Sequence, residues 1–213
     1  MADSDDVVSD PRTSVARVLR QLGHAIVAHH VDEDVLERIG GFLGGVVAEV
    51  EAGRIRGRDI THVRRTMFAG TPADGRAMQH FPDCIVSGKA NPMGIAIQVV
   101  RDGDEAVATV ALGAAFEGAP GRAHGGIVAA IFDDVMGYVL SIHQTPAYTA
   151  RLTIVYRAPV PLKANLEFRS RLVARDGRKL RLTAEAWHAG TVIADAEALF
   201  IGISPERFGG ATS

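Results

Sequence analysis

Two amphipathic helices are predicted near the start of the chain from the spacing of its hydrophobic residues. Apolar side chains recur at helical spacing from Arg12 to His24, and a broader apolar stripe runs from about Asp34 to Ala52. Four glycines, at positions 40, 41, 44 and 45, lie within the second stretch. Because each glycine weakens a helix by about 1 kcal/mol relative to alanine, we expect this helix either to kink or to pack closely against another element.

Residues 53–93 form an irregular stretch in which glycine and proline interrupt any sustained period. It contains a basic cluster, RIRGR at 54–58, followed by Arg64 and Arg65. These charges are either solvated in a loop or contact a phosphate or a partner subunit. The composition changes near Asn91, where we place the start of the main domain.

Beyond that point the pattern predicts β-strands around a single helix. The segment from about Gly125 to Ile142 is apolar nearly all round, and such a helix is buried in a soluble protein. A sheet that curls around it buries it most easily, so we predict an α+β fold with an antiparallel sheet wrapped around one long central helix. The predicted strands are 94–101, 105–112, 148–156, 166–175, 180–188 and 191–203, with hairpin turns at 102–104 and 176–178.

Composition and charge narrow the class of protein. The chain has 213 residues, of which 47% are hydrophobic and 23% charged, which indicates a globular protein and argues against wholesale disorder. Its 23 Lys and Arg against 25 Asp and Glu exclude a dedicated nucleic-acid binder, which needs a basic surface. With Cys84 as the single cysteine, neither an internal disulfide nor a cysteine-based zinc site can form.

The same features predict a soluble cytoplasmic protein without a membrane span. A single cysteine suits a reducing compartment, and no run reaches the roughly 18 to 20 consecutive apolar residues that cross a bilayer. The acidic residues 1–10 lack the basic and apolar regions of a secretory signal. We also expect no metal, because the pair His29 and His30, followed by Asp32, lacks a further ligand at suitable spacing.

Candidate chemistry lies at the start and in the middle of the central helix. Glycines after His124, at 125 and 126, leave backbone N–H groups unshielded, and these donors with the helix dipole suit an oxyanion or a carbonyl oxygen. Asp133 and Asp134 lie farther along the helix, where burial of an unpaired carboxylate costs several kcal/mol. Either one points outward while the other pairs locally, or one lines a cleft as a base or nucleophile.

The motif FEGAPGRAHGGIVAAIFDDVMG, followed by YTARLTIVYRAPVPL, resembles the hotdog-fold acyl-CoA thioesterases of the PaaI type, especially the branch of the human mitochondrial thioesterase superfamily members. The resemblance covers about residues 84–204. It implies a hotdog fold, paired protomers that share their active sites, and hydrolysis of acyl-CoA to free acid and CoA in fatty acid metabolism. It implies no cofactor, since CoA is part of the substrate.

Carried over residue by residue, the resemblance assigns roles to individual positions. His124 and Gly125 fall on the family's His-Gly, whose glycine N–H polarises the thioester carbonyl. Asp133 falls on its catalytic carboxylate, and Thr149 on an assisting threonine. The candidate substrate-binding residues are Gly126, Gly137, Arg157, Arg178 and Lys179. Gly137 leaves room for an acyl chain or a close helix contact. The basic residues either bind CoA phosphates or are solvated.

The spacing of Gly125 and Asp133 predicts that the site is shared between subunits. From Gly125 to Asp133 is eight residues, a rise of about 12 Å along an α-helix. The two are therefore too far apart to act on one carbonyl from one chain. If both act, Gly125 of one protomer works with Asp133 of the other, which requires a homodimer. A tetramer of two such dimers is equally compatible.

Two other functions stay open. One is a non-catalytic module that binds acyl-CoA, and the other is a hotdog-type dehydratase or hydratase of acyl thioesters. The predicted organisation is a disordered acidic tail (1–11), a helical and irregular N-terminal extension (12–90), the hotdog domain (91–204) and a C-terminal tail (205–213). We expect the extension to cover the groove or the dimer edge and to bias acyl-chain selection.

Overall fold

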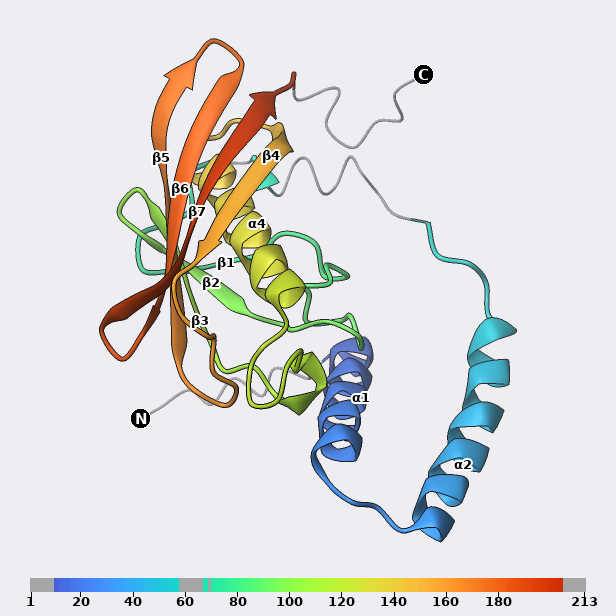
Figure 1. Ribbon diagram of the computed structural model, residues 1–213. Coiled ribbons are helices and arrows are strands. Elements are labelled where there is room, and N and C mark those ends of the chain that lie inside the picture. The colour runs from blue at the N-terminus through green and yellow to red at the C-terminus, as the bar shows by residue number, and fades with distance from the viewer. Residues whose placement is uncertain (1–9, 58–66, 69, 205–213) are drawn as a thin grey trace, which may run out of the picture.

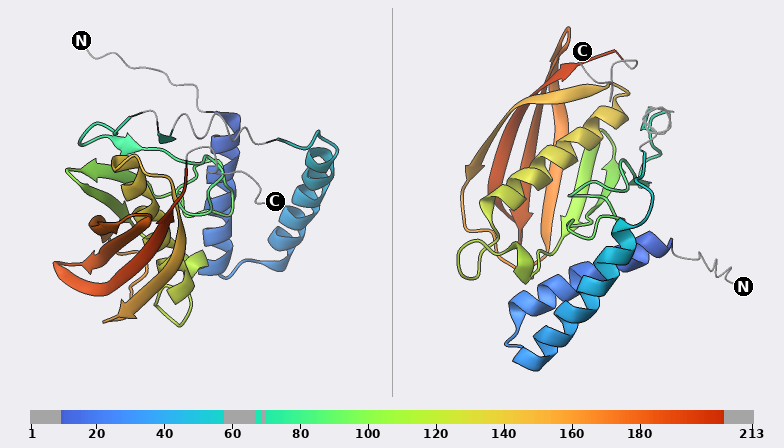
Figure 2. Two further views of the ribbon diagram at one scale, coloured as in Figure 1. Left: turned by 90° about the horizontal axis from the view of Figure 1, so that it is seen from above. Right: turned by 90° about the vertical axis from the view of Figure 1, so that its right-hand side faces the viewer.

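One antiparallel sheet wraps a long helix in the computed structural model, which describes residues 10–57, 67–68 and 70–204. The strand order is β1-β2-β3-β5-β6-β7-β4, and α4 (Gly125–Ile142) lies against the concave face of the sheet (Figures 1 and 2). The predicted hotdog fold is thereby confirmed. The strands are β1 (Ala77–Met78), β2 (Gln98–Asp102), β3 (Glu105–Val110), β4 (Ala147–Tyr156), β5 (Leu166–Asp176), β6 (Lys179–His188) and β7 (Thr191–Gly202).

Helix α4 forms the core because it carries apolar side chains on nearly all of its sides. Its buried side chains include Phe132 and Tyr138, and Phe132 meets Phe168 of β5 edge to face with ring centroids 5.1 Å apart. By length and composition alone, α4 could cross a membrane, but 56% of it is buried inside the domain. The helix therefore has the packing of a core helix.

The first long strand begins later than its sequence pattern predicts. Residues 94–97 lie outside β2, because Ile95 and Ile97 donate backbone hydrogen bonds to Ile85 and Val86 in the preceding loop. Ala96 has a positive φ of 60°, which is incompatible with a regular strand. The apolar alternation here reflects packing against a loop, which adds Val86 to the core.

Part of the irregular stretch also joins the sheet. The two-residue strand β1 pairs with β2, and Met78 belongs to the core. The segment around 77–90 therefore packs against the sheet. That the main domain begins near residue 91 stays a prediction. Of the predicted tail 1–11, residues 1–9 lie outside the described residues, while Asp10 and Pro11 form the start of the first helix. Residues 205–213, Arg64 and Arg65 also lie outside the described residues.

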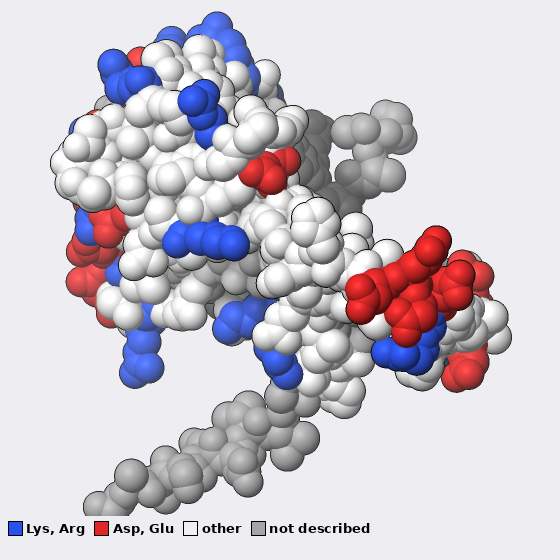
Figure 3. Space-filling view, turned by 60° about the horizontal axis from the view of Figure 1, so that its bottom comes forward, with Lys and Arg blue, Asp and Glu red and all other residues white. Residues whose placement is uncertain are grey.

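Two helices precede the sheet, and they differ in packing. Helix α1 (Pro11–Ala28) begins after Asp10, whose side chain accepts from the Arg12 N–H, and it packs on the 3-10 helix η1 (Ala114–Phe116). Helix α2 (Glu33–Glu51) has no buried residue and stands away from the sheet (Figures 1 and 2). Figure 3 shows acidic side chains gathered on this end of the molecule.

The glycines of α2 do not mark a close contact within the described residues. A Cβ built at any of the four, at 40, 41, 44 or 45, meets no atom within 4 Å. The alternative of tight packing against another element of the described chain is therefore wrong. Beyond this helix, Arg56 of the predicted basic cluster pairs with Asp83, which also pairs with Arg12 of α1.

Candidate active site

The start of α4 presents one uncommitted backbone donor. His124 is the N-cap, and its Nδ1 accepts a 3.0 Å hydrogen bond from the Gly126 N–H. Tyr156, at the end of β4, donates from its hydroxyl to the Gly125 carbonyl oxygen at 2.7 Å. The Gly125 N–H donates to no atom of the described residues. With the helix dipole behind it, this N–H can bind a carbonyl oxygen or an oxyanion.

An open hollow of about 750 Å³ lies in front of this helix start. Its walls combine polar and basic side chains with the glycine backbone, so a polar ligand group can approach the helix N-terminus. The lining includes Gly118, Arg122, His124, Gly125, Tyr156 and Arg157. Tyr156, on strand β4, lines this hollow and directs its hydroxyl at the helix start.

Asp133 lies farther along α4 and faces solvent beside β4. Its Oδ1 accepts a 2.7 Å hydrogen bond from the Thr149 hydroxyl, and both residues are exposed. The pairing of β4 with β7 shifts at this point, because Ala150 is an extra residue between the paired Thr149 and Arg151. Such a bulge redirects side chains. The carboxylate is thus held at one oxygen and is accessible to water and substrate.

Asp134 occupies a different environment, although it is the next residue. It is half-buried beneath the loop at 84–87, where its Oδ1 accepts from the Cys84 thiol at 3.3 Å. Burial is the main cause that raises the pKa of Asp134, and the neighbouring Asp133 charge adds to it, while the nearby Ser87 hydroxyl and the thiol of Cys84 oppose it. The same burial and the Asp134 charge raise the pKa of the Cys84 thiol. Of the two aspartates, Asp133 is therefore the one open to a ligand.

The other predicted binding residues are spread over the domain. Gly137 is half-buried, and a Cβ added to it would meet no atom within 4 Å, so there is open space one helical turn beyond Asp133. Arg157 lies at the hollow by Gly125 and is paired with Asp195. The N–H of Gly126, the neighbour of Gly125, donates a hydrogen bond to Nδ1 of His124.

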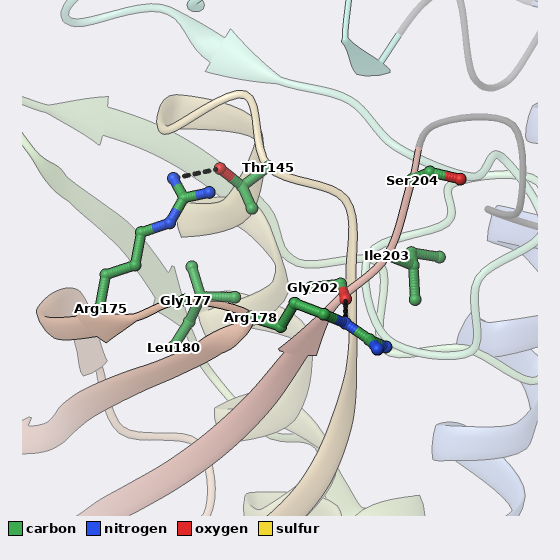
Figure 4. A pocket seen from close by; sticks show the side chains of 8 residues that line it. All are labelled: Thr145, Arg175, Gly177, Arg178, Leu180, Gly202, Ile203 and Ser204. Atoms are coloured by element: carbon green, nitrogen blue, oxygen red, sulfur yellow. Dashed lines mark hydrogen bonds between the residues drawn. The ribbon is translucent and has the colours of Figure 1, made fainter.

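Arg178 and Lys179 lie at the opposite end of the sheet from the start of α4. Arg178 donates from Nε to the Gly202 carbonyl at 2.8 Å and lines an open hollow of about 520 Å³ with Arg175 and Thr145 (Figure 4). Lys179 pairs with Ile201, which pairs in turn with Tyr148 beside Thr149. These basic residues therefore share an end of the sheet with Thr149, and Arg175 joins them although the sequence gives no sign of it.

No metal cluster is formed by the part of the chain that the structure describes: it contains no group of three or more His, Cys, Asp and Glu side chains that could hold an ion. The residues that carry chemistry are instead a helix N-terminus and an exposed carboxylate. Between Gly125 and Asp133 the helix rises about 12 Å, so a single subunit does not bring the two together.

The sheet, its central helix and the glycine at the start of that helix define a hotdog-domain protein. Residues 120–194 of this domain match the model of the thioesterase superfamily. A crystal structure described as protein RHA08564, a thioesterase superfamily protein, has the same fold, with a TM-score of 0.76 and 24% identity over 91% of each chain.

Two curated relatives match part of the chain. Mouse acyl-coenzyme A thioesterase THEM4 is 38% identical over 93 residues, which are 43% of this chain and 40% of the mouse protein. The bovine THEM4 is 32% identical over 120 residues, which are 54% of this chain and 49% of the bovine protein. The chain thus matches less than half the length of each of these relatives.

Proposed function

We propose that this protein hydrolyses acyl-CoA thioesters to the free acid and CoA. The observation that carries the proposal is the Asp133 carboxylate, held at one oxygen by Thr149 and open to solvent on a helix whose N-terminus offers a free N–H at Gly125. The thioesterase-superfamily match and the similarity to acyl-CoA thioesterases from mouse and cow support it.

The helix start binds the reacting carbonyl. A thioester oxygen that accepts from the Gly125 N–H becomes more negative as the tetrahedral intermediate forms, and the helix dipole stabilises that charge. Tyr156 holds the carbonyl of the same glycine and so limits rotation of the first helical residue. His124 caps Gly126, which leaves Gly125 as the donor for the substrate.

Asp133 supplies the attacking group by one of two routes. As a general base it takes a proton from water, whose oxygen attacks the carbonyl carbon; the C–S bond then breaks and the CoA sulfur takes up the proton. As a nucleophile it attacks the carbon itself, CoA leaves, and water hydrolyses the resulting anhydride. Single turnover in ¹⁸O-labelled water tests the second route, because label enters Asp133 only through the anhydride, when water attacks its aspartyl carbon.

The two groups act together in a homodimer. Strand β4 is an edge of the sheet and exposes apolar side chains, including Val155 at 49% and Tyr156 at 47% exposure. An open edge of this kind pairs readily with another strand. A two-fold axis across the middle of β4 would set residues 147–149 of one strand beside 154–156 of its copy, so that Asp133 of one protomer approaches the partner's Gly125.

The rest of the proposal concerns the substrate and its surroundings. Arg157, Arg178 and Lys179 are candidates to meet CoA phosphates, and the space beside Gly137 is a candidate for the acyl chain. The protein acts in the cytoplasm on fatty acyl or aromatic acyl groups without a cofactor, and pairs of dimers are a further assembly compatible with the fold.

Release of free CoA from a panel of acyl-CoAs of different chain lengths tests the proposal. We expect hydrolysis by the wild-type protein and its loss in Asp133→Asn, while the matched variant Asp134→Asn keeps the greater part of the activity. Binding of acyl-CoA without release of CoA would establish the binding module instead. Addition or removal of water at an enoyl thioester, followed by absorbance, would establish the hydratase.

A further inference from the structure

A contact of α1 with the loop before α4 connects the N-terminal extension to the helix start. His24 of α1 lies at the centre of this contact, where its Nδ1 accepts a 3.0 Å hydrogen bond from the Ala115 N–H of η1. The imidazole also meets the Phe116 ring edge to face, with centroids 5.0 Å apart and an interplanar angle of 76°. One side chain of the extension thus contacts η1 by both a polar and an apolar interaction.

The loop is shaped to receive this ring. A Cβ at Gly113 would lie 2.6 Å from the Nδ1 of His24, so a residue other than glycine would push the imidazole away. The chain therefore approaches His24 at a distance that only glycine permits. This close fit holds the position of η1 relative to α1.

From η1 the contact continues to the N-cap of α4. The Phe116 carbonyl oxygen accepts from the His124 N–H at 2.8 Å. Gly118 packs so closely that a Cβ there would lie 2.9 Å from the Cα of His124. A displacement of η1 would therefore displace His124, and with it the peptide that carries the Gly125 N–H.

The hydrogen bond from Ala115 requires an unprotonated Nδ1 on His24. Burial lowers the pKa of His24, and the guanidinium of Arg20 on the same helix lowers it further, so the ring is neutral at pH 7. Helix η1, which packs on His24, consists of Ala114, Ala115 and Phe116 and carries no titratable side chain. The electrostatic surroundings thus favour the acceptor form.

We propose that His24 is a positioning residue, which holds η1 and through it aligns His124 and the Gly125 N–H for the thioester carbonyl. The inference rests on the proposed function and extends it to α1, which contributes no residue to the hollow at the helix start. The extension then affects the rate of the chemical step and leaves the binding of CoA unchanged.

Two substitutions at His24 separate the hydrogen bond from the bulk of the ring. His24→Leu puts an apolar side chain in the place of the ring and removes the acceptor, whereas His24→Asn places an amide oxygen near the position of Nδ1. We expect His24→Leu to lower kcat by about tenfold or more with KM within about twofold of the wild type, as for a misaligned catalytic group. His24→Asn should recover most of kcat. His30→Leu, at an exposed position just after α1, is the matched control and should leave both constants unchanged.

Amide hydrogen exchange of residues 113–126, measured without substrate, reads the same contact independently of catalysis. We expect exchange there to be faster by about tenfold in His24→Leu than in the wild type and in the other two variants. If His24→Leu does not fold, Gly113→Ala, which displaces the ring, takes its place with the same expectation.

Unchanged exchange across 113–126 in a folded His24→Leu protein would overturn the inference, as would a normal kcat in that variant. A wild-type protein that releases no CoA contradicts the proposed hydrolysis alone, because the exchange experiment still decides whether His24 holds the loop.

Discussion

The hydroxyl of Thr149 donates a 2.7 Å hydrogen bond to Oδ1 of Asp133, which joins the central helix to the edge strand at an exposed carboxylate. One oxygen of the carboxylate is thereby committed, and the other is directed by this bond. The bond orients the group that we propose as base or nucleophile, so its loss should affect catalysis more than folding.

Thr149→Ala should lower kcat by about tenfold, which corresponds to about 1.4 kcal/mol of transition-state stabilisation. Thr149→Ser keeps the hydroxyl and should restore at least part of the rate. Because the site is exposed, the free energy of unfolding should change by less than about 0.5 kcal/mol in both variants. Steady-state kinetics and urea denaturation check these values, and equal rates in the Ala and Ser variants would argue against the role of the hydroxyl.

A shared active site predicts complementation between two inactive variants. Gly125→Pro removes the N–H at the first helical position, where proline is tolerated, and Asp133→Asn removes the carboxylate. If each site takes one group from each subunit, a mixed dimer has one intact site. Random exchange of subunits at equal concentrations should then restore about a quarter of the wild-type activity, since half of the dimers are mixed. Activity that stays at the background level after exchange would contradict the shared site.

Tyr156→Phe should weaken the start of α4. It removes the hydrogen bond to the Gly125 carbonyl, and a bond of this kind contributes about 0.5 to 1.5 kcal/mol. The half-exposed position favours the lower end of that range. We expect a small loss of stability in urea denaturation and a larger, several-fold loss of kcat. A variant with lowered stability and unchanged kcat would show that the tyrosine only braces the strand.

His80 should make the folded protein sensitive to acid. Its ring stacks on Tyr138 with centroids 3.6 Å apart and hydrogen-bonds Ser141 at 2.8 Å. Burial lowers the pKa of His80 from 6.5 to about 3. Between pH 6.5 and about pH 3, His80 takes up a proton in the unfolded chain and stays neutral in the folded chain. The free energy of unfolding therefore falls by about 1.4 kcal/mol for each unit by which the pH decreases in this range. Above pH 6.5 the group has no effect.

Comparison with His80→Gln isolates this contribution from the other titrating groups. Urea denaturation at pH 5 and pH 7.5 should show a smaller loss of stability in the variant than in the wild type. His30→Gln, at an exposed position just after α1, serves as the control and should behave as the wild type does. Identical pH dependence in all three proteins would exclude His80 as the acid-sensitive group.

Local sequence patterns predict the elements that have a strong periodicity. The apolar segment from Gly125 to Ile142 coincides with α4, and the four strands after it begin and end within one residue of their predicted bounds. Strand β1 has two residues and no period to detect, and it exists because β2 offers it an edge. The start of β2 differs because bonds to Ile85 and Val86 replace strand pairing.

The candidate site is predictable where its residues are neighbours in the chain. The His-Gly-Gly motif and the pair of aspartates stand out in the sequence. The distinction between Asp133 and Asp134 depends on the loop at 84–87, about fifty residues away, and so does not follow from the local pattern. The contacts of Tyr156 and His24 likewise join segments that are distant in the chain, and the hydrophobic periodicity of the sequence does not predict them.

The extra residue Ala150 gives β4 one position at which a residue can be lost without a change of register. Along a strand, successive residues face opposite sides. Deletion of Ala150 would leave Thr149 opposite Phe200 and Arg151 opposite Leu199, so regular alternation would return and Thr149 would keep its place facing the helix. Loss of one codon at this position would therefore spare the chemistry, whereas in β3, which pairs without an extra residue, the same loss would turn the following side chains to the opposite face.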